Sequence, residues 1–208
     1  VIAAHARSID GNTEDQQVTG TPSGILQICT DLFARLNSFA ELGHPLTGKL
    51  TINPRPTDIM ELVNLAVEQR RDAAALKRVR FDVARSTNLS PISLEPEHMQ
   101  FAIEHLLARA AEYAPADSTV QIGAHLSGGW VRVTIRVPGK GLPEDAVEAA
   151  QKYPHSPARL GRCAHPVLAF ALAVIRRLAA RHEGKLTFER EQDEQRLILA
   201  LPLVGPRD

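Results

Sequence analysis

The sequence predicts an α+β fold in which a mixed β-sheet is covered on one face by helices and is preceded by a helical hairpin or a single helix. Two observations predict this fold class. Two runs of alternating apolar residues, Val120 to Leu126 and Val131 to Val137, flank Ser127-Gly128-Gly129 and indicate a β-hairpin. Runs with apolar residues at spacings of three and four lie on both sides of this hairpin, as in helices that pack on a sheet.

The N-terminal region predicts a helix from Ile25 to Leu42 with one broad apolar stripe. The stripe consists of Ile25, Ile28, Cys29, Leu32, Phe33, Leu36, Phe39 and Ala40. It is too wide for a lone surface helix, so it packs in a core or in a helical hairpin that dimerises. We predict a homodimer through this helix.

Strands and helices then alternate up to the hairpin. Leu50 to Ile52 is a short extended piece, which Pro54 and Pro56 close. A helix follows, with Asp58 as its N-cap and Glu61 in a capping box. The remaining predicted elements are a strand over Val79–Val83, an extended piece over Pro91–Leu94, and a helix from Glu95 to Tyr113 that buries Met99, Ala102, Ile103, Leu106, Leu107 and Ala110.

The second hairpin strand leads into Gly139-Lys140-Gly141, where glycine serves either a tight turn or a close ligand. Residues 144–165 predict a long loop with at most one short helix. An apolar helix over Val167–His182 is predicted to end at Gly184. Two strands, Lys185–Arg190 and Arg196–Pro202, complete the sheet.

Composition excludes several classes of function. The 208 residues have a formal net charge of zero, so we expect no nucleic-acid partner. No apolar run reaches the length of a membrane span, and two distant cysteines favour a reducing compartment. The histidines lack metal-ligand spacing, so we expect no metal site. We interpret the chain as a cytoplasmic fragment of a longer protein.

Five segments in this order resemble the C-terminal half of sensor histidine kinases over about residues 25–203. They are Leu50 to Ile59, Met99 to Pro115, Gly139 to Pro143, Leu172 to Leu186, and Leu199 to Leu203. The resemblance implies a dimerisation and phosphotransfer-like region at 1–48 and a histidine-kinase ATPase-like domain at 49–208. It also implies ATP and magnesium as ligands, a response regulator or another histidine kinase as partner, and a larger sensor as parent.

The sequence departs from the family at positions that hold the nucleotide. The family's N-box has two asparagines, one of them a magnesium ligand, where this chain has His105 and Arg109. Arginine has no acceptor atom and cannot bind a cation. The family's adenine-binding aspartate, which precedes the glycines of the G1 box, is replaced by Val137, although Gly139, Lys140 and Gly141 keep the rest of that box.

The third departure is the glycine-rich G2 box, which aligns with Val167-Leu168-Ala169-Phe170-Ala171 and has lost every glycine. Side chains there fill the space that a phosphate needs. We therefore expect neither ATP nor magnesium to bind. In the opposite interpretation, His105, Arg109 and Lys140 replace the charge of the metal and bind phosphate directly.

A phosphoacceptor histidine is the other requirement of the family, and His5 is the candidate upstream of residue 25. No acidic residue follows His5, and it lies close to the predicted turn of the hairpin. Three hypotheses follow. The first is a degenerate kinase module that acts as a dimeric signalling scaffold. The second is a histidine phosphotransferase that docks a response regulator, and the third is a divergent active kinase.

Overall fold

The computed structural model describes residues 53–84, 89–153, 159 and 162–203, all within one unit of the chain that spans Phe39–Asp208. The predicted dimerisation helix, His5, and the extended piece at residues 50–52 lie outside the described residues. Predictions that concern them stay predictions.

Five strands form one mixed sheet, in the order β2-β4-β5-β7-β6. Their bounds are β2 Arg80–Val83, β4 Thr119–Ser127, β5 Trp130–Pro138, β6 Lys185–Arg190 and β7 Glu194–Pro202. Strands β2 and β4 are parallel, and the other three pairs are antiparallel. The β4–β5 hairpin is confirmed, with Gly128 and Gly129 at φ values of +59° and +78° in its turn.

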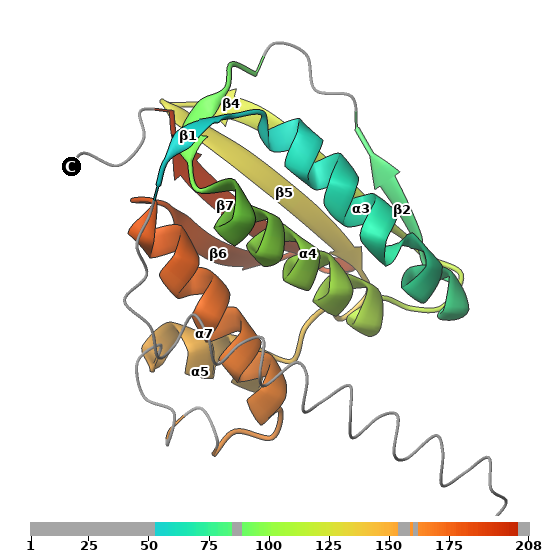
Figure 1. Cartoon of the computed structure of the whole chain (residues 1–208). Helices are drawn as coiled ribbons and strands as arrows, with labels where there is room; N and C mark the ends of the chain where they lie inside the picture. The colour runs from blue at the N-terminus through green and yellow to red at the C-terminus, as the bar shows by residue number, and fades with distance from the viewer. Residues whose placement is uncertain (1–52, 85–88, 154–158, 160–161, 204–208) are drawn as a thin grey trace, which may run out of the picture. The chain divides into compact units, whose positions relative to one another are not determined.

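Three helices lie on one side of this sheet: α3 (Ile59–Leu76), α4 (Pro96–Tyr113) and α7 (Pro166–Arg181) (Figure 1). Helix α5 (Glu144–Lys152) packs against α7 and lies at the start of residues 144–165, which were predicted to form a long loop with at most one short helix. Asp58 caps α3 as predicted, because its carboxylate accepts a hydrogen bond of 2.8 Å from the backbone N–H of Met60. The predicted α+β fold class is thus confirmed.

The core lies between the helices and the inner face of the sheet. Alternate residues of the central strands are buried there: Val120, Ile122, Val131, Val133, Ile135, Val137, Leu197, Leu199 and Leu201. All six residues predicted to form the buried face of α4 are buried as well. Burial of each large apolar side chain contributes roughly 1.5–3 kcal/mol to the free energy of unfolding.

One local prediction was wrong: Pro56 does not close an extended piece. The chain forms strand β1 at Arg55–Thr57 with Pro56 inside it, and β1 pairs antiparallel with β3 (Ile92–Leu94) in a separate two-stranded sheet. Proline is tolerated there because each strand of such a sheet has a free edge. Helix α7 agrees with the predicted helix to within one residue at each end, and the Gly184 N–H closes it by donating to the Ala179 carbonyl at 2.8 Å, after Glu183 at φ +55°.

His182 joins the end of α7 to the start of α4. Its Nδ1–H donates to the Leu178 carbonyl at 2.8 Å, and its Nε2 accepts from the Glu95 backbone N–H at 3.0 Å. Only a neutral imidazole can make both bonds. Burial lowers the pKa of His182, against the opposing effect of the hydrogen bond to Leu178. These contacts give His182 a structural role at the end of α7.

His182→Ala is expected to lower the free energy of unfolding by about 3 kcal/mol, because it leaves a partly buried N–H and a buried carbonyl unpaired and opens a cavity. Urea unfolding followed by circular dichroism measures the loss. His98→Ala is the matched control, since His98 contacts the His182 ring but makes no hydrogen bond with the described residues. A loss below about 1 kcal/mol in His182→Ala would contradict the structural role.

Candidate functional site

The turn Gly139-Lys140-Gly141 joins β5 to α5, and both of its glycines are required by the fold. Gly139 and Gly141 have φ values of +75° and +60°, a region that L side chains rarely adopt. A Cβ atom on Gly139 would lie 2.9 Å from the Pro115 ring, and one on Gly141 would lie 2.5 Å from the Cβ of Gln195. The turn interpretation of these glycines therefore needs no ligand.

The backbone of this turn is held by two side chains that the sequence reasoning missed. The buried amide oxygen of Gln195 accepts from the Leu142 N–H at 2.7 Å. Arg190 donates to the carbonyl of Lys140 at 2.5 Å and to that of Leu142 at 3.0 Å. Arg190 and Gln195 are register partners on β6 and β7. The sequence could have indicated these contacts, because at the end of each strand a polar residue takes a place where the alternation predicts an inward-facing side chain.

Val137, the residue that we expect at the position of the family's adenine-binding aspartate, is fully buried, with 0% of its surface exposed. It belongs to the same hydrophobic core as Leu142, which follows the turn, and Ala146 of α5. The first turns of α7 also belong to this core, with Leu168 at 2% and Ala169 at 0% exposure. Val137, Leu168, Ala169 and Ala171 thus belong to one apolar core.

His105 and Arg109 lie one turn apart on α4, but their environments differ. His105 is buried, with its ring centroid 4.1 Å from that of Phe101. Burial, followed by the positive charges of Arg70 and Arg109, lowers the pKa of His105 to about 4. His105 is therefore neutral at pH 7.

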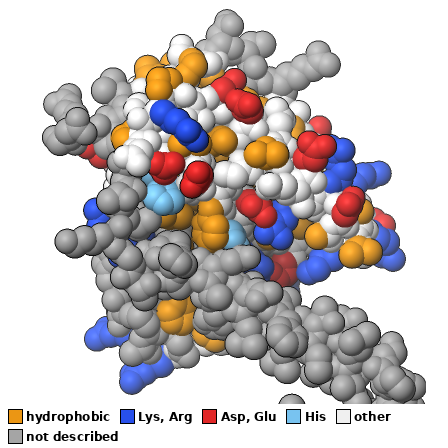
Figure 2. Space-filling view, viewed as in Figure 1, with side chains coloured by type: hydrophobic (Ala, Val, Ile, Leu, Met, Phe, Trp, Pro, Cys, Tyr) orange, Lys and Arg blue, Asp and Glu red, His pale blue; other side chains and the backbone are white. Residues whose placement is uncertain are grey.

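The Arg109 side chain is 21% exposed and forms an ion pair of 2.5 Å with Glu112. Its Nε is buried and has no hydrogen-bond partner in the described structure. A guanidinium at this position offers only donors and positive charge, so it repels a magnesium ion. The space-filling view shows acidic and basic side chains interspersed over α3 and α4 (Figure 2).

The end of α4 lies near the start of α5. The pKa of the Tyr113 hydroxyl is raised, first by burial and then by the negative charge of Glu112. The positive charge of Arg109 opposes this rise, and the negative charge of Asp145 adds to it. Asp145 also contacts the start of α7: its carboxylate lies 2.9 Å from Nδ1 of His165 and accepts from the His165 backbone N–H at 3.2 Å. We predict that Arg109 faces a cleft towards residues 144–166; this stays a prediction, because part of that segment lies outside the described residues.

The described part of the chain has no group of three His, Cys, Asp or Glu side chains that could hold a metal ion. Two of its cavities lie away from His105, Arg109 and Val137. One, of about 380 Å³, lies on the open face of β4 and β5, and another, of about 330 Å³, lies between α5 and β6. None of the described helices has the length and apolarity that crossing a membrane requires.

Comparison with known proteins agrees with the fold. Residues 95–205 match the family described as histidine kinase-, DNA gyrase B-, and HSP90-like ATPase. No curated protein matches the chain.

Solved structures with the same fold include two histidine kinases and the protein ShkA. Histidine kinase AdeS of Acinetobacter baumannii is 12% identical, with a TM-score of 0.59 over 97% of this chain and 92% of AdeS. Histidine kinase ThkA, in complex with the response regulator TrrA, is 15% identical, with a TM-score of 0.70 over 98% of this chain and 57% of that chain. Full-length ShkA in complex with AMPPNP is 17% identical, with a TM-score of 0.69 over 98% of this chain and 42% of that chain.

Proposed function

Because the chain belongs to the histidine kinase-, DNA gyrase B- and HSP90-like ATPase family, we propose that it is a degenerate histidine kinase module of two-component signalling that acts as a dimeric scaffold without binding Mg-ATP. The observation that carries this proposal is the apolar core at the nucleotide position. Val137, Leu168 and Ala169 are all at most 2% exposed there.

Each part of the nucleotide loses a different interaction. A buried adenine amino group facing Val137 has no acceptor, and an unpaired buried donor costs about 1–3 kcal/mol. The phosphates need bare backbone amides at a helix start, but α7 begins with Pro166 and carries side chains packed in the core. The magnesium ion meets the cation of Arg109 in place of a carbonyl oxygen.

The partner that suits this scaffold is a response regulator or another histidine kinase. Similarity in fold to ThkA, which was solved with a response regulator, supports this kind of partner. Phosphate transfer through His5 is the competing function. It predicts a stable phosphohistidine after the chain is mixed with a phosphorylated response regulator, whereas the scaffold binds the regulator without becoming phosphorylated.

The dimer is tested by light scattering at tens of micromolar protein, where we expect twice the mass of one chain. Leu36→Glu is expected to convert the dimer to a monomer, because it places a charge at the centre of the apolar stripe. Arg35→Glu, its neighbour off the stripe, is the matched control. A wild-type monomer at this concentration would overturn the dimeric scaffold.

A further inference from the structure

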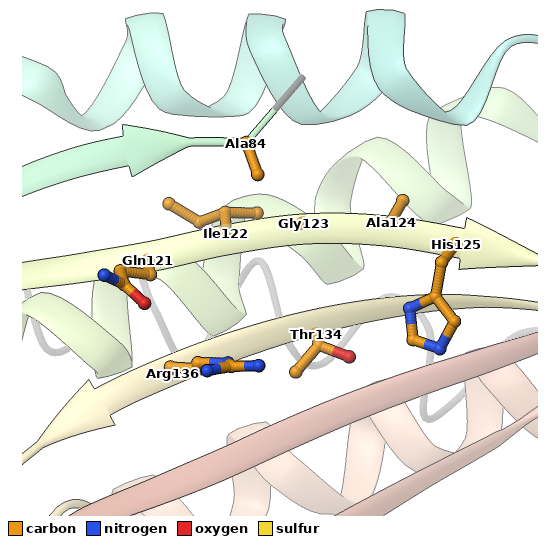
Figure 3. A pocket seen from close by; sticks show the side chains of 8 residues that line it. All are labelled: Ala84, Gln121, Ile122, Gly123, Ala124, His125, Thr134 and Arg136. Atoms are coloured by element: carbon orange, nitrogen blue, oxygen red, sulfur yellow. The ribbon is translucent and has the colours of Figure 1, made fainter. Parts of the chain in front are cut away.

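The five-stranded sheet has an open face, opposite the face covered by α3, α4 and α7, and this open face carries a pocket of about 380 Å³ (Figure 3). We call it the open-face pocket. Its lining residues are Ala84, Gln121, Ile122, Gly123, Ala124, His125, Thr134 and Arg136. None of the eight is acidic, and the volume is in the range of small-ligand sites.

Gly123 forms the floor of the open-face pocket, in the middle of β4. A Cβ atom built on it would meet only the Cβ of Ala84, at an ordinary contact distance of 3.6 Å, and its φ is not in the left-handed region. Neither packing nor backbone conformation therefore requires glycine here. Glycine weakens a strand interior and often marks a place where a ligand approaches the backbone closely.

The strand opposite Gly123 presents a row of donors. The register of β4 and β5 pairs Gly123 with Thr134, Gln121 with Arg136, and His125 with Arg132. Thr134 therefore lies between two arginines on the same face of β5, since alternate residues of a strand share a face. Figure 3 shows Gln121, His125, Thr134 and Arg136 around the floor at Gly123.

The arginines on this face of the sheet differ in whether an acidic side chain of the chain pairs with them. Arg196, the register partner of Arg136 on β7, pairs with Glu191 and Glu194 at 2.8 Å each. Arg136 is exposed and forms no hydrogen bond or ion pair with the described residues. Arg136, which lines the open-face pocket, therefore keeps its positive charge and its donors available to a ligand.

We propose that the open-face pocket binds a small ligand with an oxyanion group, a carboxylate or a phosphate, through Arg136. The planar guanidinium donates two parallel hydrogen bonds to either group. Thr134 and Gln121 add neutral donors, and Gly123 lets the ligand approach the sheet. This inference goes beyond the proposed scaffold function, because the pocket lies on the opposite face of the sheet from His105, Arg109 and the start of α7.

The test follows the backbone amide signal of Thr134 by NMR in the whole 208-residue chain, together with that of Gly123 in the proteins that keep this glycine. Sodium phosphate and sodium succinate are titrated separately, with sodium chloride keeping the ionic strength constant. We expect saturable shifts, and at least a tenfold loss of affinity in both Arg136→Gln and Gly123→Val. Gly123→Val should keep the fold, since the added side chain enters free space. Arg80→Gln, on β2 outside the pocket, is the control and should leave the affinity unchanged.

Each outcome decides. Saturation by phosphate alone identifies a phosphate ligand, and saturation by succinate alone identifies a carboxylate ligand. Shifts that never saturate, or an affinity that Arg136→Gln leaves unchanged, mean an adventitious ion only and overturn the proposal. If Gly123→Val fails to fold, as judged by circular dichroism, Arg136→Gln against Arg80→Gln decides alone.

Discussion

Lowering the pH from 7 to 4 is expected to remove about 3 kcal/mol of the free energy of unfolding through His105 alone. The pKa of His105 is about 4 in the folded chain against an ordinary value of 6.5. The neutral imidazole is the form that folding favours, so this stability is fully present above pH 6.5. It is lost progressively as the pH falls towards 4, because the unfolded chain then binds the proton first. His182, whose pKa is also lowered, acts in the same direction.

Urea unfolding at a series of pH values measures this dependence. His105→Leu is the matched variant, because leucine can pack against Phe101 without titrating. The difference in free energy of unfolding between wild type and variant should shift by about 3 kcal/mol between pH 7 and pH 4. A difference that stays constant over this range would show that His105 is solvated and that the core around α4 is not as described.

The second large effect is expected at Val137. Val137→Asp introduces the residue type that the resemblance to the family implies at this position, yet it should lower the free energy of unfolding by about 4 kcal/mol or more. The physical reason is that Val137 is fully buried in the apolar core, where a carboxylate has neither water nor a partner. Thermal and urea unfolding at pH 7 measure the loss.

Val137→Thr is the control for Val137→Asp, because it keeps the shape of valine and adds one uncharged polar group; its cost should be about 1–3 kcal/mol. If Val137→Asp is as stable as the wild type, the position faces a solvated pocket. That result would favour the divergent-kinase hypothesis.

Local patterns in the sequence predicted most of the fold. The alternation of β4 and β5 around a Gly-Gly turn, the cap at Asp58 and the buried face of α4 all depend on near neighbours in the chain. The strand at Arg55–Thr57 was not predicted, because it forms only through its pairing with β3, about 37 residues away in the register. Tertiary pairing overrides the low strand propensity of proline there.

The candidate site was predicted less completely. The sequence placed Val137, His105 and Arg109 correctly on their strand and helix, but which atoms surround them depends on packing between distant elements. The contacts of Gln195 and Arg190 with the 139–142 turn span roughly 50 residues of sequence, and no local pattern encodes them. Gly123 looked like an ordinary small residue of a strand, because its empty surroundings appear only in the folded sheet.

Isothermal titration of the folded chain with ATP and magnesium at pH 7 tests the central claim most directly. The family binds ATP with modest affinity, and this chain has lost at least two interactions with the nucleotide, each of about 1–3 kcal/mol. Because each 1.4 kcal/mol weakens binding about tenfold, we expect a dissociation constant beyond about 1 mM and no measurable saturation. The same sample must show cooperative unfolding, so that absent heat is not the result of a misfolded chain. A magnesium-dependent dissociation constant below about 100 μM would contradict the account and identify the chain as a divergent, nucleotide-binding kinase.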